Sequence, residues 1–280
     1  METLTPSALE SAARSFASAH ATGDLIAAFV AGSGITLSAP GWEKAAEAPY
    51  SEVFPFPILE LAGHTPTVGV WRRGRAGLLV FNGRFHLYQG YCANQVAAIP
   101  RLAALLGAPV YIATNATGAI DPAVPAGGLV VIRDHLNFQG TSPLLGEWGR
   151  WRKPMFPDLS DAYDRPLREV AARCARQAGF SVHEGVYVAT LGPNYETPAE
   201  VEAFRRMGGT VVGMSTVQEV IAARHMGMRV VVLSLATNLA AGIASGPLTH
   251  EEVLEAGRAA HDRLERLVQN LIAELAQGVA

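Results

Sequence analysis

Apolar runs of strand length alternate along most of the chain with segments that have helical periodicity. The apolar runs predict strands over residues 25–31, 68–71, 78–81, 110–113, 129–132, 186–190, 210–212 and 230–234. The helical pattern covers residues 6–20, 94–106, 166–177, 198–207 and 217–225, and then runs from residue 250 to the C-terminus. A hairpin around residues 74–75 occurs together with helical crossovers, which predicts an α/β domain with a mixed sheet.

Residues at the helix ends support these boundaries. Thr5 and Pro6 are typical of a helix start, and Thr249 with Glu252 forms a capping-box pattern before the last helix. Pro100 is expected to bend the helix over residues 94–106.

The longest expected loop spans residues 141–157, but no shift in composition marks it as a boundary. Residues 1–280 are therefore expected to form a single domain.

Composition and charge narrow the class of protein. The chain has 280 residues and a mass of 29.6 kDa, with 49% hydrophobic and 17% charged residues, which is an ordinary globular balance. The net charge of −3 leaves no basic excess for a nucleic-acid backbone, so no nucleic-acid partner is expected. Cys92 and Cys174 provide neither a disulfide framework nor a zinc-binding spacing, which favours a cytoplasmic location.

One long uncharged segment resembles a membrane span in hydropathy alone. Residues 230–248 carry no charge, but their asparagine, glycines and hydroxyl groups fit a buried strand followed by a loop better than a membrane span. The N-terminal segment has acidic residues and lacks the basic start of a signal peptide. The sequence therefore predicts no association with a membrane.

Two common nucleotide-binding and catalytic motifs are incomplete, and a third is absent. Residues 32–34 read Gly-Ser-Gly, but the third glycine of a dinucleotide-binding fingerprint is missing. Residues 213–217 begin like a nucleophile elbow, with Val217 in place of the closing glycine. The P-loop sequence does not occur. Dehydrogenase, serine hydrolase and P-loop nucleotidase functions are therefore disfavoured.

Polar residues at the ends of apolar strands indicate an oxyanion site instead. Arg84, His86 and Tyr88 alternate, and in an extended segment alternate side chains point to one face. A cation, an imidazole and a phenol on one face suit a ligand such as phosphate, although a polar edge strand would show the same pattern. Ser33 lies in a glycine-flanked loop, which either binds an anion through its N–H groups or forms a plain tight turn.

Eight polar or glycine-containing segments form a series along the chain. In order, they are Gly32-Ser33-Gly34, 83–88, Thr114-Asn115-Ala116, 133–137, 192–197, 212–216, Thr237-Asn238 and 250–253. With this series the chain resembles the trimeric purine nucleoside phosphorylase family over nearly its whole length. The resemblance implies a three-layer α/β/α fold with a mixed, partly barrel-like central sheet. It also implies an enzyme of purine salvage, which uses phosphate to split nucleosides into free base and (deoxy)ribose 1-phosphate.

The resemblance further implies roles for particular residues. The implied phosphate site comprises Ser33, His64, Arg84, His86, the Ala116 backbone N–H and Ser215. The implied ribose site comprises Tyr88, Met214 and His250. The implied base site comprises Tyr195, Glu196, Val212, Gly213 and Asn238. Of these residues, His86, Glu196 and Asn238 are the implied catalytic groups.

These residue types suit the implied reaction. Departure of the base leaves a cation-like ribose, which a bound phosphate stabilises, and it places negative charge on the purine, which the Asn238 amide stabilises. Glu196 can accept from the N1–H of a 6-oxopurine such as hypoxanthine or guanine. No metal or organic cofactor is expected, and phosphate is a co-substrate. Gln89 stands where the family usually has Glu, which removes a charge beside His86.

Other functions remain open on the sequence. A methylthioadenosine phosphorylase is the nearest alternative, but that family usually has Ser and Asp in place of Glu196 and Asn238. A nucleoside hydrolase and a catalytically impaired nucleoside-binding paralogue are further alternatives. The resemblance also implies a homotrimer in which an aromatic residue of a neighbouring subunit closes the ribose site. The loop that holds Trp148, Trp151 and Phe156 is the expected source of that residue.

Overall fold

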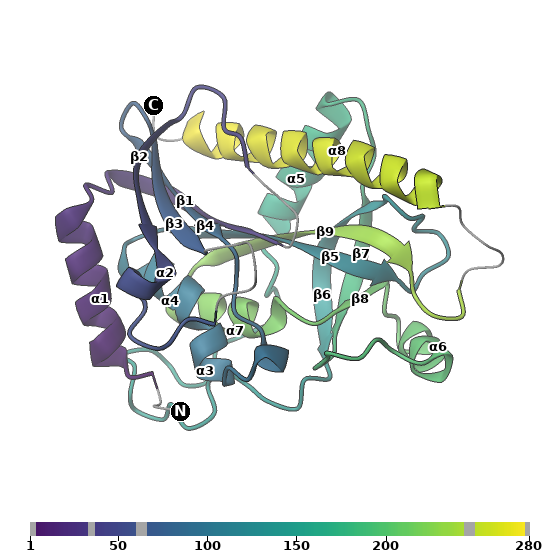
Figure 1. The fold of residues 1–280 in the computed structure, drawn as a ribbon, viewed down its shortest axis with the longest axis horizontal. Helices are drawn as coiled ribbons and strands as arrows, with labels where there is room; N and C mark the ends of the chain where they lie inside the picture. Colours follow the sequence, from purple (N-terminus) through teal and green to yellow (C-terminus); the bar gives the residue numbers. More distant parts are fainter. Residues whose placement is uncertain (1–3, 33–36, 60–65, 244–249, 278–280) are drawn as a thin grey trace.

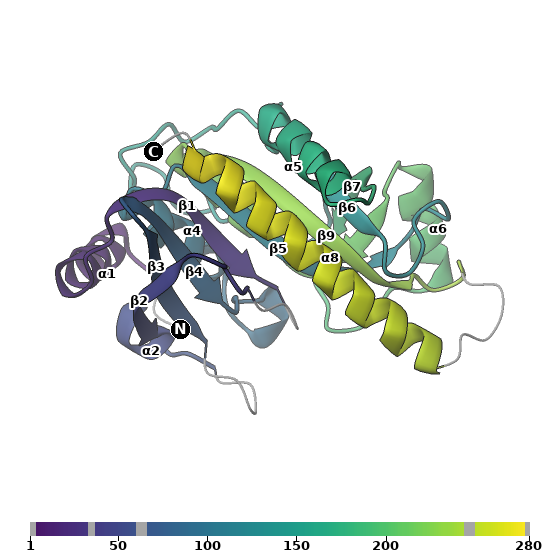
Figure 2. The same ribbon diagram turned by 90° about the horizontal axis from the view of Figure 1, so that it is seen from above.

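Strands form a mixed sheet across the molecule, and helices cover both faces of this sheet (Figures 1 and 2). The computed structural model describes residues 4–32, 37–59, 66–243 and 250–277. The strands are β1 (Asp24–Ala31), β2 (Glu43–Pro49), β3 (Thr67–Arg73), β4 (Ala76–Asn82), β5 (Val110–Ala119), β6 (Leu129–Asn137), β7 (His183–Ala189), β8 (Val211–Gly213) and β9 (Arg229–Leu239). The helices are α1 (Pro6–Ala19), α2 (Tyr50–Val53), α3 (Ala93–Val96), α4 (Ala98–Leu105), α5 (Arg165–Gln177), α6 (Pro198–Arg206), α7 (Val217–Met226) and α8 (His250–Gln277), with a 3₁₀ turn η1 (Leu87–Gln89).

Strand β5 closes part of the sheet into a barrel. The strands follow the order β2-β3-β4-β1-β5-β8-β7-β6-β9, and β9 returns to pair with β5 in parallel. Strands β5, β8, β7, β6 and β9 thus form a closed ring, and β1, β4, β3 and β2 extend from β5 as an open sheet. Parallel and antiparallel pairs occur in both parts. The expected mixed, partly barrel-like sheet is confirmed.

Alternate residues of the central strands point into different hydrophobic cores. In β1, Ala28 and Val30 belong to the core covered by α1, α4 and α7, whereas Ala27 and Phe29 belong to the core covered by α5 and α8. Because helices cover both faces, both sets of side chains are buried, and the strands read as continuous apolar runs. Figure 2 shows α8 lying lengthwise across the sheet with α5 beside it. The three-layer arrangement is therefore confirmed.

The expected helices form within the described residues, with small differences at their ends and one at an internal bend. The Thr5 hydroxyl caps α1 by accepting a hydrogen bond from the Ala8 N–H at 3.3 Å. The helix expected over residues 94–106 is divided at Ala97 into α3 and α4, so the prediction of a bend at Pro100 is wrong. A proline ring clashes with the carbonyl four residues earlier, which here is that of Val96, and the break therefore precedes the proline. Thr249 lies outside the described residues.

Several strands differ from their expected extents. Strands β5, β6 and β9 continue through polar residues such as Asn115, Asp134 and Asn238, because barrel closure supplies backbone partners where the apolar pattern stops. Strand β2 was not expected, since its sequence EKAAEAP has no apolar alternation; it pairs with β3 at the outer edge of the open sheet.

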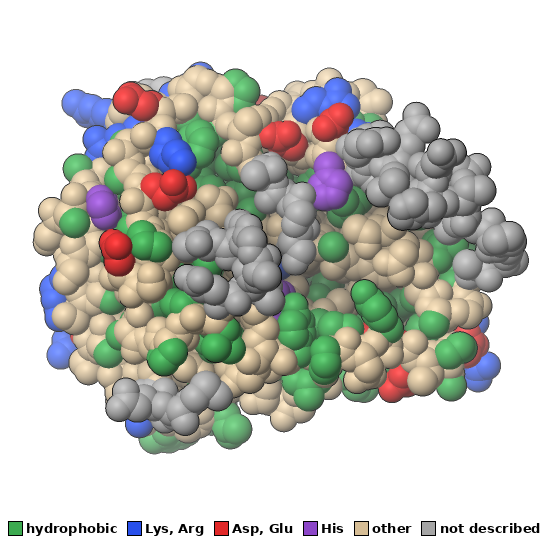
Figure 3. All heavy atoms as spheres, in the orientation of Figure 1, with side chains coloured by type: hydrophobic (Ala, Val, Ile, Leu, Met, Phe, Trp, Pro, Cys, Tyr) green, Lys and Arg blue, Asp and Glu red, His purple; other side chains and the backbone are tan. Residues whose placement is uncertain are grey.

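The face seen in Figure 3 carries hydrophobic side chains near its centre and most of its charged side chains toward the margin. None of the helices described is long and apolar enough to cross a membrane.

Candidate active site

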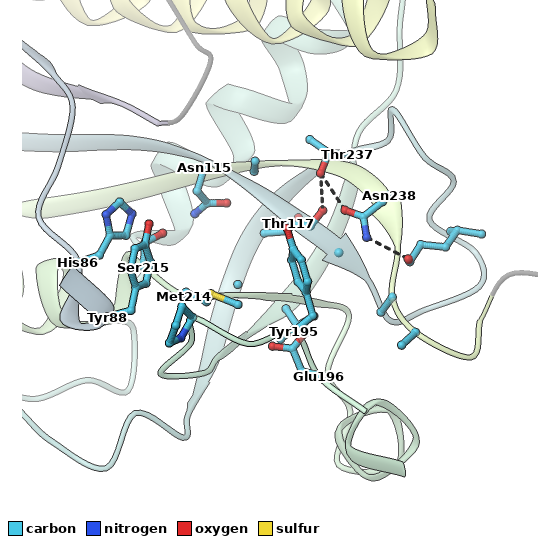
Figure 4. Close-up of a pocket in the computed structure, with 18 of the residues that line it drawn as sticks. His86, Tyr88, Asn115, Thr117, Tyr195, Glu196, Met214, Ser215, Thr237 and Asn238 are labelled. Atoms are coloured by element: carbon cyan, nitrogen blue, oxygen red, sulfur yellow. Dashed lines mark hydrogen bonds between the residues drawn. The ribbon is translucent and has the colours of Figure 1, made fainter. Parts of the chain in front are cut away.

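A cavity of about 640 Å³ lies at the carboxyl ends of strands β5, β8 and β9. Its lining includes these predicted site residues: Arg84, His86, Tyr88, Ala116, Tyr195, Glu196, Val212, Gly213, Met214, Ser215 and Asn238. Figure 4 shows His86, Tyr88 and Ser215 at one end of the pocket and Tyr195, Glu196 and Asn238 toward the other end. The fold thus brings segments far apart in the sequence to one cavity, at the sheet edge where ligands of α/β proteins bind.

Three predicted site residues cannot be placed in this pocket. Ser33 and His64 lie outside the described residues. His250 begins α8, but its side chain is outside the part of the chain that the structure describes. Their assignment to the phosphate and ribose sites stays a prediction.

Arg84 supplies a buried positive charge at one end of the pocket. Its side chain is only 3% exposed. One terminal nitrogen, Nη1, donates to the Ser215 hydroxyl at 3.3 Å, and the other, Nη2, is buried with no hydrogen-bond partner among the described residues. A buried guanidinium nitrogen without an acceptor is unfavourable unless a ligand supplies one. The arrangement therefore favours an oxyanion at this end of the cavity.

A strained turn presents Ser215 to the pocket. Thr216 has φ 71° and ψ −49°, and the Val217 N–H bonds back to the Ser215 carbonyl at 2.8 Å. This three-residue turn is rare, and it costs a β-branched residue about 1–3 kcal/mol of backbone strain. The Asn115 amide holds the Thr216 hydroxyl at 2.8 Å, and the Tyr187 hydroxyl accepts from the Ser215 N–H at 3.2 Å. The surroundings thus fix the turn and with it the serine hydroxyl.

Position 213, next to this turn, must be glycine for a steric reason. A Cβ at Gly213 would collide with the hydroxyl of Tyr187, the same group that accepts from the Ser215 N–H. Close approach of the strand to the tyrosine is therefore part of how Ser215 is positioned.

His86 lies in the same half of the cavity, and its environment keeps it neutral. Burial, together with the neighbouring Arg84 cation, lowers the pKa of His86 from its ordinary value to about 4, against a small opposing effect of Gln89. The Gln89 amide oxygen accepts from the His86 backbone N–H at 2.9 Å and lies 3.2 Å from Nδ1. Because that oxygen can only accept, Nδ1 carries the proton, and Nε2 is left as an acceptor.

Tyr88 reaches the pocket by a different route from the one expected. Strand β4 ends at Asn82, and Tyr88 lies in the 3₁₀ turn η1, so the expected extended segment through residue 88 is wrong. The tyrosine ring nevertheless stacks on the His86 ring, with centroids 4.6 Å apart and planes inclined by 21°. The expected grouping of Arg84, His86 and Tyr88 is therefore present, but a turn and ring stacking produce it.

The other half of the cavity carries a carboxylate and an amide. One oxygen of Glu196 accepts from the Thr190 hydroxyl at 2.8 Å, and its other oxygen is not held by that bond. Asn238 is exposed, and among the described residues its amide accepts from the Thr237 hydroxyl at 3.0 Å and donates to the Leu239 carbonyl at 3.0 Å. An amide has two N–H groups and two acceptor positions, so these two bonds do not by themselves prevent contact with a ligand.

Some lining residues were not predicted as site residues. They are Asn115, Thr117, Gly118, Pro193, Thr237, Leu239, Ala240 and Ala241. The parallel pairing of β5 and β9 places Gly118 opposite Asn238, which is why residues 120 positions apart in sequence line one wall. The motifs around Asn115 and Thr237 marked these segments, but motifs alone do not show which side chains face a cavity.

In the described residues, no group of three or more His, Cys, Asp or Glu side chains is placed to hold a metal ion.

The loop over residues 141–157 presents two of its three large aromatic residues to solvent. Trp151 is buried against the chain's own core, where its indole N–H donates to Glu147 at 2.7 Å. Trp148 and Phe156 are 72% and 81% exposed and pack edge to face, with centroids 5.8 Å apart. Trp151 is therefore excluded as a residue that reaches a neighbouring subunit.

The sequence profile of the Phosphorylase superfamily matches residues 13–273. The chain belongs to the phosphorylase superfamily. The match runs from helix α1 to helix α8, so it includes every strand of the sheet and each segment that lines the cavity.

Curated members of the phosphorylase superfamily match the chain over most of its length. Purine nucleoside phosphorylase 1 of Geobacillus stearothermophilus is 41% identical over 248 residues, which cover 89% of this chain and 90% of the relative. Purine nucleoside phosphorylase of Bos taurus is 39% identical over 255 residues, covering 89% of this chain and 88% of the relative. The expected kinship with purine nucleoside phosphorylases is confirmed.

Solved phosphorylase structures share the fold. Purine nucleoside phosphorylase of Schistosoma mansoni in complex with adenosine superimposes with a TM-score of 0.86 at 33% identity, covering 97% of this chain and 98% of that chain. A Schistosoma purine nucleoside phosphorylase in complex with guanosine gives a TM-score of 0.81 at 31% identity, with 97% and 98% coverage.

Proposed function

We propose that this protein is a purine nucleoside phosphorylase that converts 6-oxopurine (deoxy)nucleosides such as inosine and guanosine, together with phosphate, into free base and (deoxy)ribose 1-phosphate. Relatives of that name match nearly nine-tenths of the chain at about 40% identity, which supports this activity. The observation that carries the proposal is one cavity with a buried, incompletely paired cation at one end and a carboxylate with an amide at the other. An oxyanion fits the cation end and the base of a nucleoside fits the other end, so that both ligands can bind at the same time.

The cation end is the proposed phosphate site. The Arg84 terminal nitrogens, the Ser215 hydroxyl and the Ala116 N–H donate to phosphate oxygens, with Ser33 and His64 as further proposed ligands. The hydroxyl of monohydrogen phosphate donates a hydrogen bond to Nε2 of the neutral His86 ring, since the Nδ1–H is directed to Gln89. These contacts hold phosphate in a defined orientation below the sugar, so that one of its oxygens attacks C1′.

The carboxylate end is the proposed base site. As the oxygen of phosphate bonds to C1′, the C1′–N9 bond breaks and its electron pair passes to the purine. The Asn238 amide then stabilises the developing negative charge. Solvent delivers a proton to N7 of the leaving base, and this balances the proton that monohydrogen phosphate releases as it becomes the sugar phosphate. Glu196, as a carboxylate, accepts from the N1–H of hypoxanthine or guanine, and Tyr195, Val212 and Gly213 form the walls.

Between these ends lies the proposed ribose site. Met214 lies between the two ends of the cavity, Tyr88 lies next to it at the cation end (Figure 4), and His250 is proposed to meet the 5′-hydroxyl. No metal ion or organic cofactor takes part in the proposed reaction, and the phosphate is itself a substrate.

We place the enzyme in cytoplasmic purine salvage, as a homotrimer whose ribose site is completed by Phe156 or Trp148 of a neighbouring subunit. The exposure of both aromatic side chains supports that arrangement.

The test of the proposed function is release of hypoxanthine from inosine with and without inorganic phosphate. We expect release only with phosphate, formation of ribose 1-phosphate in equal amount, similar behaviour with guanosine, and little reaction with adenosine or methylthioadenosine. Release without phosphate would indicate a hydrolase. Preference for methylthioadenosine would indicate the related phosphorylase, and no release from any nucleoside would indicate a binding paralogue. Each of these three results would contradict the proposal.

A further inference from the structure

Behind Arg84 lies a buried carboxylate that does not line the cavity. Glu219, in the first turn of α7, is fully buried, and its Oε1 lies 3.1 Å from Arg84 Nε. Its other oxygen, Oε2, accepts from the buried Tyr111 hydroxyl at 2.8 Å. The three side chains thus form a line from strand β5 through α7 to the pocket, and only Arg84 reaches the cavity.

The ion pair constrains how the guanidinium faces the pocket. A guanidinium is planar, and its five N–H groups have fixed directions. Arg84 Nε and Glu219 Oε1 form an ion pair at 3.1 Å without hydrogen-bond geometry, and Nη1 is held on the Ser215 hydroxyl. Nη2 has no hydrogen-bond partner among the described residues. The nitrogens that remain for a ligand are therefore the terminal pair, which matches two oxygens of one oxyanion.

The charge of Glu219 works against an anion in this position. A carboxylate near an oxyanion repels it, and burial raises the pKa of Glu219, although Arg84 and the Tyr111 hydrogen bond both lower it. The carboxylate is nevertheless favoured at this place, because it offsets the buried charge of Arg84 and contacts Nε and Tyr111 at the same time.

We propose that Glu219 is a positioning residue, held by Tyr111, that fixes the Arg84 guanidinium so that its terminal nitrogens face the phosphate. This inference rests on the proposed function, because it takes the oxyanion to be phosphate. The contact with Arg84 is an ion pair, so the requirement is a negative charge at the reach of Glu219 from the α7 backbone.

Two substitutions separate reach from charge. Glu219→Asp keeps the charge but withdraws the acceptor by one methylene, and Glu219→Gln keeps an acceptor at the same reach but removes the charge. We expect Glu219→Asp to raise the KM for phosphate about tenfold or more, because small misplacements of a binding group are costly. We expect Glu219→Gln to raise it about threefold or more, because the ion pair with Arg84 is lost, and the KM for inosine to change by less than about twofold in both.

The wild-type protein is assayed first, and its phosphate-dependent release of hypoxanthine establishes the proposed function independently of the variants. Binding of inorganic phosphate alone, measured by calorimetry, gives a second readout that does not depend on turnover. The inference is overturned if Glu219→Gln leaves the phosphate KM and phosphate binding unchanged, since the ion pair would then have no part in placing Arg84. It is also overturned if Glu219→Asp lowers the melting temperature and leaves the phosphate KM unmoved, since the role would then be only structural.

Discussion

At the scale of single residues, His86 and Gln89 show how a histidine stays neutral next to the proposed phosphate site. Burial and the Arg84 cation both disfavour the imidazolium, and the pKa of His86 falls to about 4. Gln89 binds Nδ1 through an uncharged oxygen and so adds no carboxylate that would favour protonation. Gln89 therefore replaces the usual family glutamate without loss of the hydrogen bond that orients the ring.

We predict that Gln89→Glu will raise the pKa of His86 by about one unit or more, because a carboxylate beside Nδ1 stabilises the imidazolium. Neutral Nε2 is the proposed acceptor for phosphate, so activity should be lost at higher pH on acidification than in the wild type. The measurement is the pH profile of kcat/KM for phosphate, in which ionisation of phosphate itself is common to both proteins.

Gln89→Met is the matched control for this prediction, because it keeps the side-chain length and adds no charge. The acidic side of its pH profile, where kcat/KM for phosphate falls, should not move to higher pH. If Gln89→Glu and wild type share one acid limb, the proposed contact between Gln89 and Nδ1 does not control the ionisation of His86.

At the scale of elements, a buried polar network ties the 141–157 loop to helices α3 and α4. Arg101 is fully buried and donates to the Asn94 side chain at 2.6 Å and to the Pro143 carbonyl at 2.8 Å. Its guanidinium also lies 4.8 Å from the centre of the Trp151 ring. Glu147, itself buried, accepts from Asn94 and from Trp151. The loop is therefore held from within, and Trp148 and Phe156 are displayed from a fixed base.

We predict that Glu147→Ala will lower the free energy of unfolding by about 1–3 kcal/mol for each of the two buried donors, Asn94 and Trp151, that lose their acceptor. Burial already lowers the pKa of Arg101 to about 10, against the opposing effect of Glu147. Denaturant unfolding at one fixed protein concentration measures the effect.

Glu47→Ala is the control, since Glu47 forms an exposed ion pair with Lys44 at 3.0 Å. Such surface pairs contribute about 1 kcal/mol or less. Equal losses in the two variants would contradict the role assigned to Glu147.

The elements also show how far the sequence could be interpreted. Apolar periodicity predicted the central strands because both faces of the sheet are covered, and the motif series predicted most of the lining residues. The closure of β5 against β9 could not be predicted, since pairing between such distant segments leaves no local pattern. Glu219 was missed because an acidic residue in the first turn of a helix is usually a solvent-exposed dipole partner. Its burial becomes visible only once the strands pack around it.

At the scale of the whole molecule, exposed apolar side chains favour self-association. Leu145 is 77% exposed and shares a loop with the exposed Trp148 and Phe156. Aromatic residues in this setting are typical of interfaces. The loop is anchored to the body of the protein, so its exposed residues are arranged before any partner binds.

We predict that the protein sediments as a trimer and that the double variant Trp148→Ser, Phe156→Ser shifts it toward the monomer, because the substitutions remove the large apolar side chains of this loop. The KM for inosine should rise at the same time, since the proposed ribose site would lose its neighbouring aromatic residue. Sedimentation velocity and steady-state kinetics at matched concentrations test both. A wild-type monomer with full activity would contradict the shared site.

The closure of the barrel has a consequence for how the chain is made. Strand β9 begins at residue 229, and both β5 and β6 depend on it for one of their neighbours. While the chain is still emerging from the ribosome, these strands present open edges that invite pairing with other chains. The wall that carries Asn238 does not exist until strand β9 has been synthesised. The nascent chain is thus most prone to aggregate in the interval just before the cavity can form.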